Sequence, residues 1–255
     1  MGWMIFKRSL GMVFDNLGAA LKVSLLLYLA QVAVGVYFER AFGAAIVAVE
    51  NGEAATVPAG FWGAWLMFLL VSLGSSLWIA VSWHRYILLR ESPGTALPPF
   101  HGPQIAAYLT RSIVLGLVLG AVFFVLAMVV GMVGSVLLGG APAQQLSVAI
   151  AVFAMGPVAY LFYRLSPILP AAAVGRPLSL RAAWAATAPL SRPIVILTLI
   201  AIGAAIVIQI PTYLNPNAMS LVNLVYSYVL GWVSLMVGLS IMTTLYGHCV
   251  EGREI

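Results

Sequence analysis

The densest group of polar side chains in the sequence is the stretch HRYILLRE at residues 84–91. An imidazole such as His84 can act as a general base, and Arg85 and Arg90 can hold a phosphate group, so the stretch contains the residue types that a membrane hydrolase of phospholipids needs. His248 offers a second imidazole. The simpler interpretation is the end of a membrane helix whose long basic side chains extend to the headgroup region, and we favour it.

A second candidate is Arg164, which lies among Tyr160, Tyr163 and three prolines. Proline removes a backbone donor, so we expect the helix to be broken or kinked here. A broken membrane helix that carries an arginine can form a site for an anionic substrate, with the two tyrosines as further contacts. The alternative is a cytoplasmic helix end that unwinds at residues 166–170, and we give this alternative more weight.

The acidic residues give no support for a catalytic centre, because none falls within a predicted membrane helix and none has metal-ligand spacing with a histidine. With three histidines and one cysteine, Cys249, we predict no metal site. No residue pattern requires a cofactor. We therefore predict that the protein is not an enzyme, and we keep a phospholipid-directed enzyme that uses His84 or His248 as a less favoured reading.

The composition predicts the elements that position these side chains. Of the 255 residues, 63% are hydrophobic and 7% are charged, whereas soluble domains contain about 25% charged residues. So few charges cannot cover a surface in water, and the chain is predicted to be an all-α polytopic integral membrane protein with a single membrane domain, residues 1–255. The net charge of +5 does not indicate a nucleic-acid partner, because the basic residues form no dense cluster.

Six apolar segments are long enough to cross a hydrocarbon core of about 30 Å as helices. An even number of spans places both termini on one side, together with eleven of the twelve basic residues, and only Arg40 falls on the other side. The excess of positive charge predicts that this side is cytoplasmic. Residues 1–17 are predicted to form an amphipathic helix in the headgroup region. The six predicted spans are 18–38, 61–88, 112–138, 147–172, 193–211 and 219–246.

The segments before the first, third and fifth spans share a pattern. Each is predicted to contain a short interfacial helix, followed by a basic residue at the entry to the span: Lys22, Arg111 or Arg192. Before the fifth span, Ser179 is expected to cap the helix and Pro189 to end it. The other three spans each return with aromatic and basic or imidazole side chains, among them Arg85, Arg164 and His248, which recur at similar intervals along the chain. We therefore predict three copies of one helical hairpin unit, at about residues 1–90, 91–176 and 177–255.

Two glycines predict close helix packing. Gly116 and Gly120 form a GxxxG pair within the third span. Such a pair lets another helix approach closely. Packing against a helix of the same chain is the commoner use, although a partner helix is the alternative.

The segment SLRAAWAAT at residues 179–187 resembles the elbow helix of a bacterial family of membrane domains. That family comprises YciC-like integral membrane proteins and the membrane domains attached to glycerophosphoryl diester phosphodiesterases, and its six-span layout with elbow helices is similar too. The resemblance implies a location in the bacterial inner membrane and a link to lipids. It implies no phosphodiesterase activity, because no segment of this sequence is long enough to form the catalytic barrel.

The sequence favours a non-enzymatic inner-membrane protein. Its cytoplasmic rim of basic residues would bind anionic phospholipid headgroups or dock another membrane protein or complex. The alternative is a small transporter or flippase-like carrier for an anionic or lipid substrate, which Arg164 and Arg85 would bind with Tyr160, Tyr163 and His84 as further contacts. The predicted lipid-binding or phosphate-binding residues are Lys22, Arg85, Arg111, Arg164, Arg181 and Arg192.

Overall fold

The computed structural model describes residues 1–50, 52, 57–137, 143–214 and 220–254. Helices account for most of these residues and no strand occurs among them, which confirms the all-α prediction. In chain order the elements are α1 (Gly2–Phe14), α2 (Leu17–Glu50), α3 (Phe61–Leu89), α4 (Gly102–Leu137), α5 (Ala143–Leu165), α6 (Ile168–Ala173), α7 (Leu180–Ala186), the short 3-10 helix η2 (Ala188–Leu190), α8 (Ser191–Leu214) and α9 (Leu221–Cys249).

Five helices are long and apolar enough to cross a membrane, namely α2, α3, α4, α8 and α9. By length and composition the chain is therefore a multi-pass membrane protein. The predicted span 147–172 corresponds to α5 and α6, and α5 is not one of the five. The helix is interrupted between Leu165, the last residue of α5, and Ile168, the first residue of α6, and Pro167 lies in this interruption. This confirms the break that the prolines predict, although α5 itself continues through Pro157.

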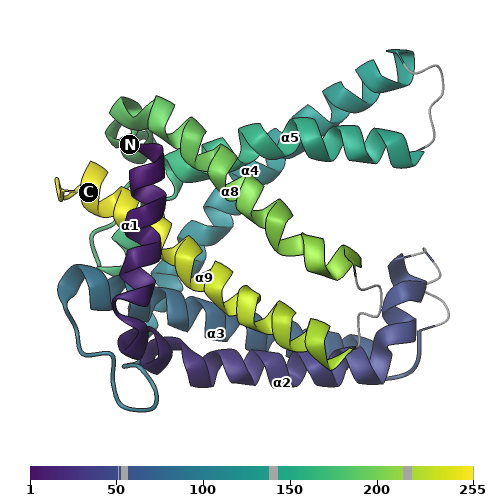
Figure 1. Cartoon of the computed structure of the whole chain (residues 1–255), viewed down its shortest axis with the longest axis horizontal. Helices are drawn as coiled ribbons and strands as arrows, with labels where there is room; N and C mark the ends of the chain where they lie inside the picture. Colours follow the sequence, from purple (N-terminus) through teal and green to yellow (C-terminus); the bar gives the residue numbers. More distant parts are fainter. Residues whose placement is uncertain (51, 53–56, 138–142, 215–219, 255) are drawn as a thin grey trace.

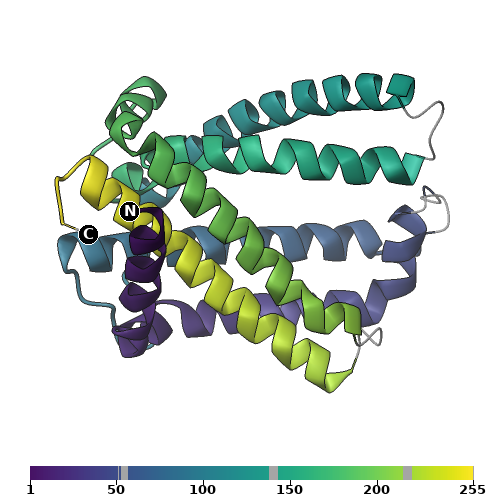
Figure 2. The ribbon, with the colours of Figure 1, turned by 45° about the horizontal axis from the view of Figure 1, so that its top comes forward.

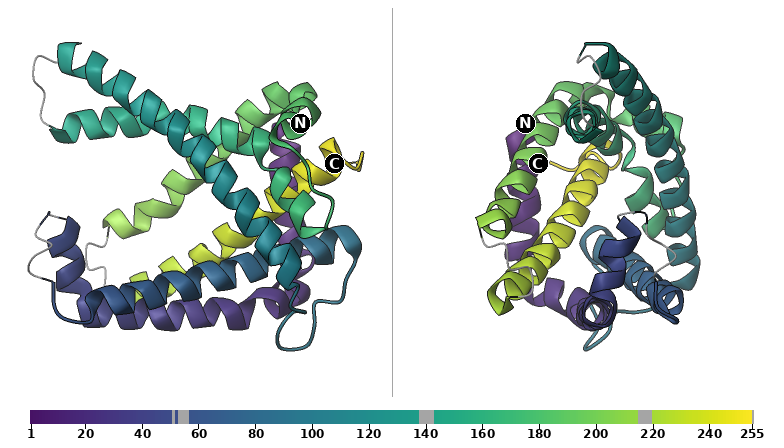
Figure 3. Two further views of the ribbon diagram at one scale, coloured as in Figure 1. Left: turned by 180° about the vertical axis from the view of Figure 1, so that it is seen from behind. Right: turned by 90° about the vertical axis from the view of Figure 1, so that its right-hand side faces the viewer.

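Both termini lie at one end of the molecule (Figure 1). The connections at residues 90–101 and 174–179 lie at the same end, which we call the basic end. At the opposite end, the distal end, α2 is followed by α3, α4 by α5 and α8 by α9. The helices converge at the basic end and separate towards the distal end, where α4 and α5 lie far from α2 and α3 (Figure 3).

The helices pair unequally. α2 packs along α3 and α4 packs along α5, whereas α8 and α9 contact each other over a short stretch only. α1 crosses α8 and α9 at the basic end (Figure 2) and packs against both. The buried side of α1 consists of Gly2, Ile5, Ser9 and Val13. Trp3 and Phe14, by contrast, are exposed, so the apolar residues of α1 divide between the protein and its surroundings.

The main hydrophobic core joins helices from all parts of the chain. Among its fully buried side chains are Trp83, Ile168, Leu197 and Leu245, which come from α3, α6, α8 and α9. A smaller cluster around Phe38 and Phe61 joins α2 to α3. α4 contributes little to the core, because Tyr108 and Leu115 are the buried side chains among its described residues. Such a helix is stable only where its surroundings are apolar.

The interfacial segments differ from one another. The N-terminal segment and the segment before the fifth span are separate helices, as predicted, and the hydroxyl of Ser179 accepts a hydrogen bond of 3.1 Å from the amide of Ala182. The prediction of a separate short helix before the third span is wrong, because those residues are the first turns of α4. Pro103 suits the first turn of a helix, and no breaking residue follows it before Gly116.

The GxxxG pair has no helix beside it. A Cβ atom added to Gly116 or Gly120 would meet nothing within 4 Å outside its own helix. The expectation that this pair serves packing within the chain is therefore wrong for the part of the chain that the structure describes.

Candidate functional site at the basic end

Arg164 is a buried cation at the end of α5, with 3% of its surface exposed. Its Nε donates to Oγ1 of Thr187 at 2.9 Å, and its Nη2 donates to the carbonyl oxygen of Trp184 at 2.8 Å. Its Nη1 donates to the hydroxyls of Tyr160 (2.8 Å) and Ser191 (3.2 Å). The guanidinium also lies 3.8 Å from the centre of the Trp184 ring. Arg164 therefore joins α5 to α7 and to the first residue of α8.

These contacts favour the helix-end interpretation of Arg164 over a substrate site. Among the described residues no carboxylate forms an ion pair with Arg164, so neutral acceptors and an aromatic face balance the buried charge. Four of the five guanidinium N–H groups already have a partner. Tyr160 accepts one of these bonds, while Tyr163 lines an apolar groove between α4 and α5.

Arg85 joins the end of α3 to two other segments. It forms a bidentate ion pair with Glu91, in which Nε lies 2.9 Å from Oε2 and Nη2 donates to Oε1. Its Nη1 donates to the carbonyl oxygen of Ala173 in α6 at 3.0 Å. Hydrogen bonds from Arg85 hold the pKa of Glu91 below its usual value, against partial burial, which raises it. His101 lies on the other side of Glu91, with Nε2 3.5 Å from Oε2.

His84 is enclosed rather than accessible. Its Nδ1 lies 2.8 Å from Oγ1 of Thr243, and its Nε2 lies 3.4 Å from the hydroxyl of Tyr108. Because the hydroxyl of Thr243 donates to the carbonyl oxygen of Leu239, Nδ1 of His84 is left as the donor and Nε2 as the acceptor. A neutral imidazole satisfies both contacts. His84 therefore packs α3 against α4 and α9, and a general base that reaches a substrate is not supported.

The C-terminal segment contributes a third joining arginine. Arg253 donates from Nη2 to the carbonyl oxygen of Leu88 at 2.8 Å and from Nη1 to that of Ile87 at 3.5 Å. A cation is stabilising there, because the last carbonyl groups of a helix lack backbone partners. The Nε of Arg253 also lies 2.7 Å from a carboxylate oxygen of Glu251. This role of Arg253 could not be predicted, since only its charge and its place after the last span are visible in the sequence.

The polar contact between α1 and α9 involves two uncharged side chains. Oγ of Ser9 in α1 lies 3.1 Å from Oγ1 of Thr244 in α9, and both atoms are buried. Polar side chains thus join each helix that ends at the basic end, α3, α5 or α9, to another segment of the chain. All of these contacts lie at the basic end.

A second group of basic side chains at this end has no such partner. No hydrogen bond or ion pair to them occurs within the described ranges, and most of them are exposed. Four of the six predicted lipid-binding residues belong to this group, whereas Arg85 and Arg164 are held by the protein itself. We call the group the free cations: Lys7, Arg8, Lys22, Arg90, Arg111, Arg181 and Arg192.

Among the described residues, no three histidine, cysteine or carboxylate side chains lie close enough together to bind a metal ion.

No protein-family model, characterised protein or solved structure matches the chain. The resemblance of residues 179–187 to an elbow helix therefore depends on the sequence pattern alone. What the basic end can do chemically is bind anions through its free cations.

Proposed function

We propose that the protein is a non-enzymatic, six-span protein of the bacterial inner membrane whose basic end faces the cytoplasm and binds the headgroups of anionic phospholipids. The observation that carries this proposal is the set of seven free cations at one end of an otherwise apolar molecule. Each basic side chain near an anionic membrane surface contributes about 1 kcal/mol to binding. Of the acidic residues at this end, Glu91 and Glu251 are already paired with Arg85 and Arg253.

The sixth span in this proposal is α5. Since α4 ends at the distal end and α7 lies at the basic end, α5 has to cover the distance that α4 covers, and it packs along α4. An even number of crossings also agrees with the two termini at one end. The cytoplasmic orientation is supported by the eleven basic residues of that end, against Arg40 alone in the distal half of α2.

The three-unit repeat is part of the same proposal. Its support is a regular spacing of the joining residues: 80 residues separate His84 from Arg164, and 80 separate Arg164 from Thr244. Each of the three side chains contacts a segment that precedes a span. His84 contacts Tyr108, Arg164 contacts Thr187, and Thr244 contacts Ser9. The register differs from the one expected from Arg85, Arg164 and His248. The joining group is an imidazole in the first unit, a guanidinium in the second and a hydroxyl in the third, at the same spacing along the sequence.

The other readings have less support. A carrier that binds its substrate through Arg164 and Arg85 would first have to break the hydrogen bonds that join α5 to α7 and α3 to α6. A phospholipid-directed enzyme would need an accessible base. His84 is enclosed, whereas His248 is half-buried in α9, with its Nδ1 held 2.7 Å from the carbonyl oxygen of Arg253. Docking of a membrane protein or complex to the same cations would depend on acidic groups of that partner.

Native mass spectrometry of the detergent-purified protein tests the proposal. We expect phosphatidylglycerol or cardiolipin to be enriched over phosphatidylethanolamine, and the enrichment to fall as salt is raised, because exposed charges are screened. The triple variant Lys22→Gln, Arg181→Gln, Arg192→Gln should lose part of the enrichment. Arg40→Gln, at a basic residue in the distal half of α2, is the control and should keep it. Absence of enrichment, or enrichment that salt leaves unchanged, would contradict the proposal.

A further inference from the structure

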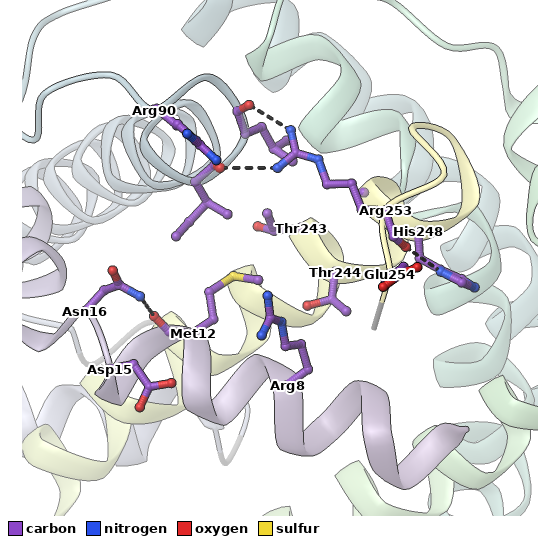
Figure 4. A pocket seen from close by; sticks show the side chains of 13 residues that line it. Arg8, Met12, Asp15, Asn16, Arg90, Thr243, Thr244, His248, Arg253 and Glu254 are labelled. Carbon is purple, nitrogen blue, oxygen red and sulfur yellow. Dashed lines mark hydrogen bonds between the residues drawn. The ribbon is translucent and has the colours of Figure 1, made fainter.

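A cavity of about 260 Å³ lies at the basic end between α1, the end of α3, and α9 with the residues that follow it (Figure 4). Arg8 lines it from α1, Arg90 from the end of α3, and Thr243 and Thr244 from α9. Figure 4 shows the side chains of Arg8, Arg90 and Thr244 around the same space. The volume is several times the roughly 30 Å³ that a water molecule occupies, so the cavity has room for a phosphate group.

The two arginines supply the free donors of this cavity. Arg8 and Arg90 form no hydrogen bond or ion pair within the described part of the chain. The hydroxyls of Thr243 and Thr244, in contrast, already donate to carbonyl oxygens of their own helix. A guanidinium can bind two oxygens of one phosphate at once, so two free guanidinium groups at one cavity suit this group better than an isolated carboxylate.

The charged side chains around the cavity divide into paired and unpaired groups. Arg253 is a third cation in its lining, held against the carbonyl groups of Leu88 and Ile87. Asp15 and Glu254 also line the cavity, but neither lies within 4.0 Å of a basic nitrogen of Arg8 or Arg90. Because Arg253 is already paired with Glu251, Arg8 and Arg90 are the unpaired cations that an anion at the cavity would meet.

The backbone at Arg90 gives an independent reason to assign a role to its side chain. Arg90 follows α3 in the left-handed conformation, with φ 56° and ψ 33°, and no other described non-glycine residue has a positive φ. This conformation costs a side-chain-bearing residue about 1 kcal/mol or more relative to glycine, which is the usual residue at such a helix end. A glycine at position 90 would end α3 without this backbone strain. The protein with Arg90 is therefore less stable than it would be with glycine, and it gains a guanidinium group at the cavity.

We propose that this cavity binds one phosphate group between Arg8 and Arg90, either the phosphodiester of a lipid headgroup or the phosphate of a soluble ester. The inference rests on the proposed function, because it assigns a particular place to anion binding at the basic end. The other free cations then form a diffuse surface, whereas Arg8 and Arg90 form a defined site.

The test compares arginines inside and outside the cavity. Phosphatidylglycerol is titrated into the detergent-purified full chain, and binding is measured by native mass spectrometry for Arg8→Gln, Arg90→Gly, Arg181→Gln and Arg192→Gln. Each of the first two should weaken binding about tenfold, the effect of removing a charge-assisted hydrogen bond. Arg181→Gln and Arg192→Gln remove exposed cations outside the cavity. In detergent, where no anionic membrane surface is present, each should weaken binding of the lipid less than about twofold.

The variant Arg90→Gly separates binding from folding. Glycine relieves the positive φ, so the melting temperature should stay at or above that of the wild type while the affinity for the lipid falls. Equal weakening by all four substitutions would overturn the cavity site and leave the proposed function intact. No weakening by any of them would overturn both.

Competition with inorganic phosphate distinguishes the two sources of the phosphate group. If millimolar phosphate displaces phosphatidylglycerol from the wild type, and Arg8→Gln weakens the binding of both, a soluble phosphate ester is supported. If phosphate does not displace the lipid but Arg8→Gln and Arg90→Gly still weaken its binding, the headgroup of a lipid is supported.

Discussion

At the scale of single residues, the basic side chains divide by what they contact. Arg85, Arg164 and Arg253 each donate to backbone carbonyl groups of a segment distant in the sequence. The sequence shows that these residues are arginines near helix ends, and nothing in it distinguishes them from Arg181 or Arg192. The partners decide the role, and the partners depend on how the helices cross.

Arg164 should be required for stability. Arg164→Gln removes most of the contacts that join α5 to α7 and α8, and we expect it to lower the free energy of unfolding by at least about 2 kcal/mol, because buried hydrogen-bond acceptors lose a charged donor. Arg164→Lys should not restore it, since an ammonium group cannot reproduce the planar set of donors. Thermal unfolding in detergent, followed by circular dichroism, measures the loss.

Arg181→Gln is the matched control for this prediction. Arg181 lies on α7 close to the Arg164 contacts but is exposed and has no partner among the described residues. Its removal should change stability by less than about 0.5 kcal/mol. If Arg164→Gln unfolds at the same temperature as Arg181→Gln, then Arg164 does not stabilise the contact between the helices. Its guanidinium would then be available to bind the substrate of a carrier.

The ion pair between Arg85 and Glu91 should make stability depend on acid. Since the pKa of Glu91 is lowered in the folded protein, its ion pair stabilises fully above the usual carboxyl pKa of about 4.3 and is lost as the pH falls through the lower folded value. The wild type should therefore melt above Glu91→Gln at pH 6, and the difference should shrink below about pH 4. A difference in melting temperature that stays constant down to pH 3 would contradict this account.

At the scale of elements, the sequence predicts helices well and their neighbours poorly. Apolar length places most ends of the long helices to within a few residues, apart from the added turns at the start of α4 and at the end of α2, which continues beyond the predicted end at residue 38 to Glu50. Local chemistry predicts the cap at Ser179 and the break before Ile168. Local chemistry does not predict that Gly116 and Gly120 lack a neighbour, or that Gly2 touches α8. Those outcomes depend on which helix lies opposite, and the periodicity of one helix contains no information about it.

The packing of α1 on α8 should be sensitive to one methyl group. A Cβ atom at Gly2 would overlap the carbonyl oxygen of Pro193 and lie 2.9 Å from Cβ of Ile196. We expect Gly2→Ala to destabilise the protein by about 1–3 kcal/mol, because α1 must move away from α8. Circular dichroism at increasing temperature measures the change.

Gly18→Ala is the control for this helix contact. Gly18 is exposed in α2, and an added Cβ there meets nothing within 4 Å outside its own helix. Because alanine is the better helix former by about 1 kcal/mol, this variant should be as stable as the wild type or more so. A Gly2→Ala protein that melts at or above the temperature of Gly18→Ala would show that α1 does not pack closely on α8.

At the scale of the whole molecule, the arginine contacts and most of the charge gather at one end, whereas neutral hydrogen bonds such as that from Gln31 to Ser75 join helices elsewhere. Composition alone predicts a membrane protein, and the even number of predicted spans places the termini at one end, as the structure has them. The separation of the helices towards the distal end could not be predicted, since it depends on crossing angles that long-range contacts set (Figure 3). The polar contacts explain why the basic end is the compact one.

The orientation of the basic end in the membrane tests the central claim most directly. Single cysteines are placed at Ser92, in the connection after α3, and at Ala59, before α3 at the distal end, in a Cys249→Ser background. They are then labelled with a membrane-impermeant maleimide in intact cells and in inverted membrane vesicles. The account predicts that Ala59→Cys is labelled in cells and Ser92→Cys only in inverted vesicles; labelling of Ser92→Cys from outside intact cells would contradict it.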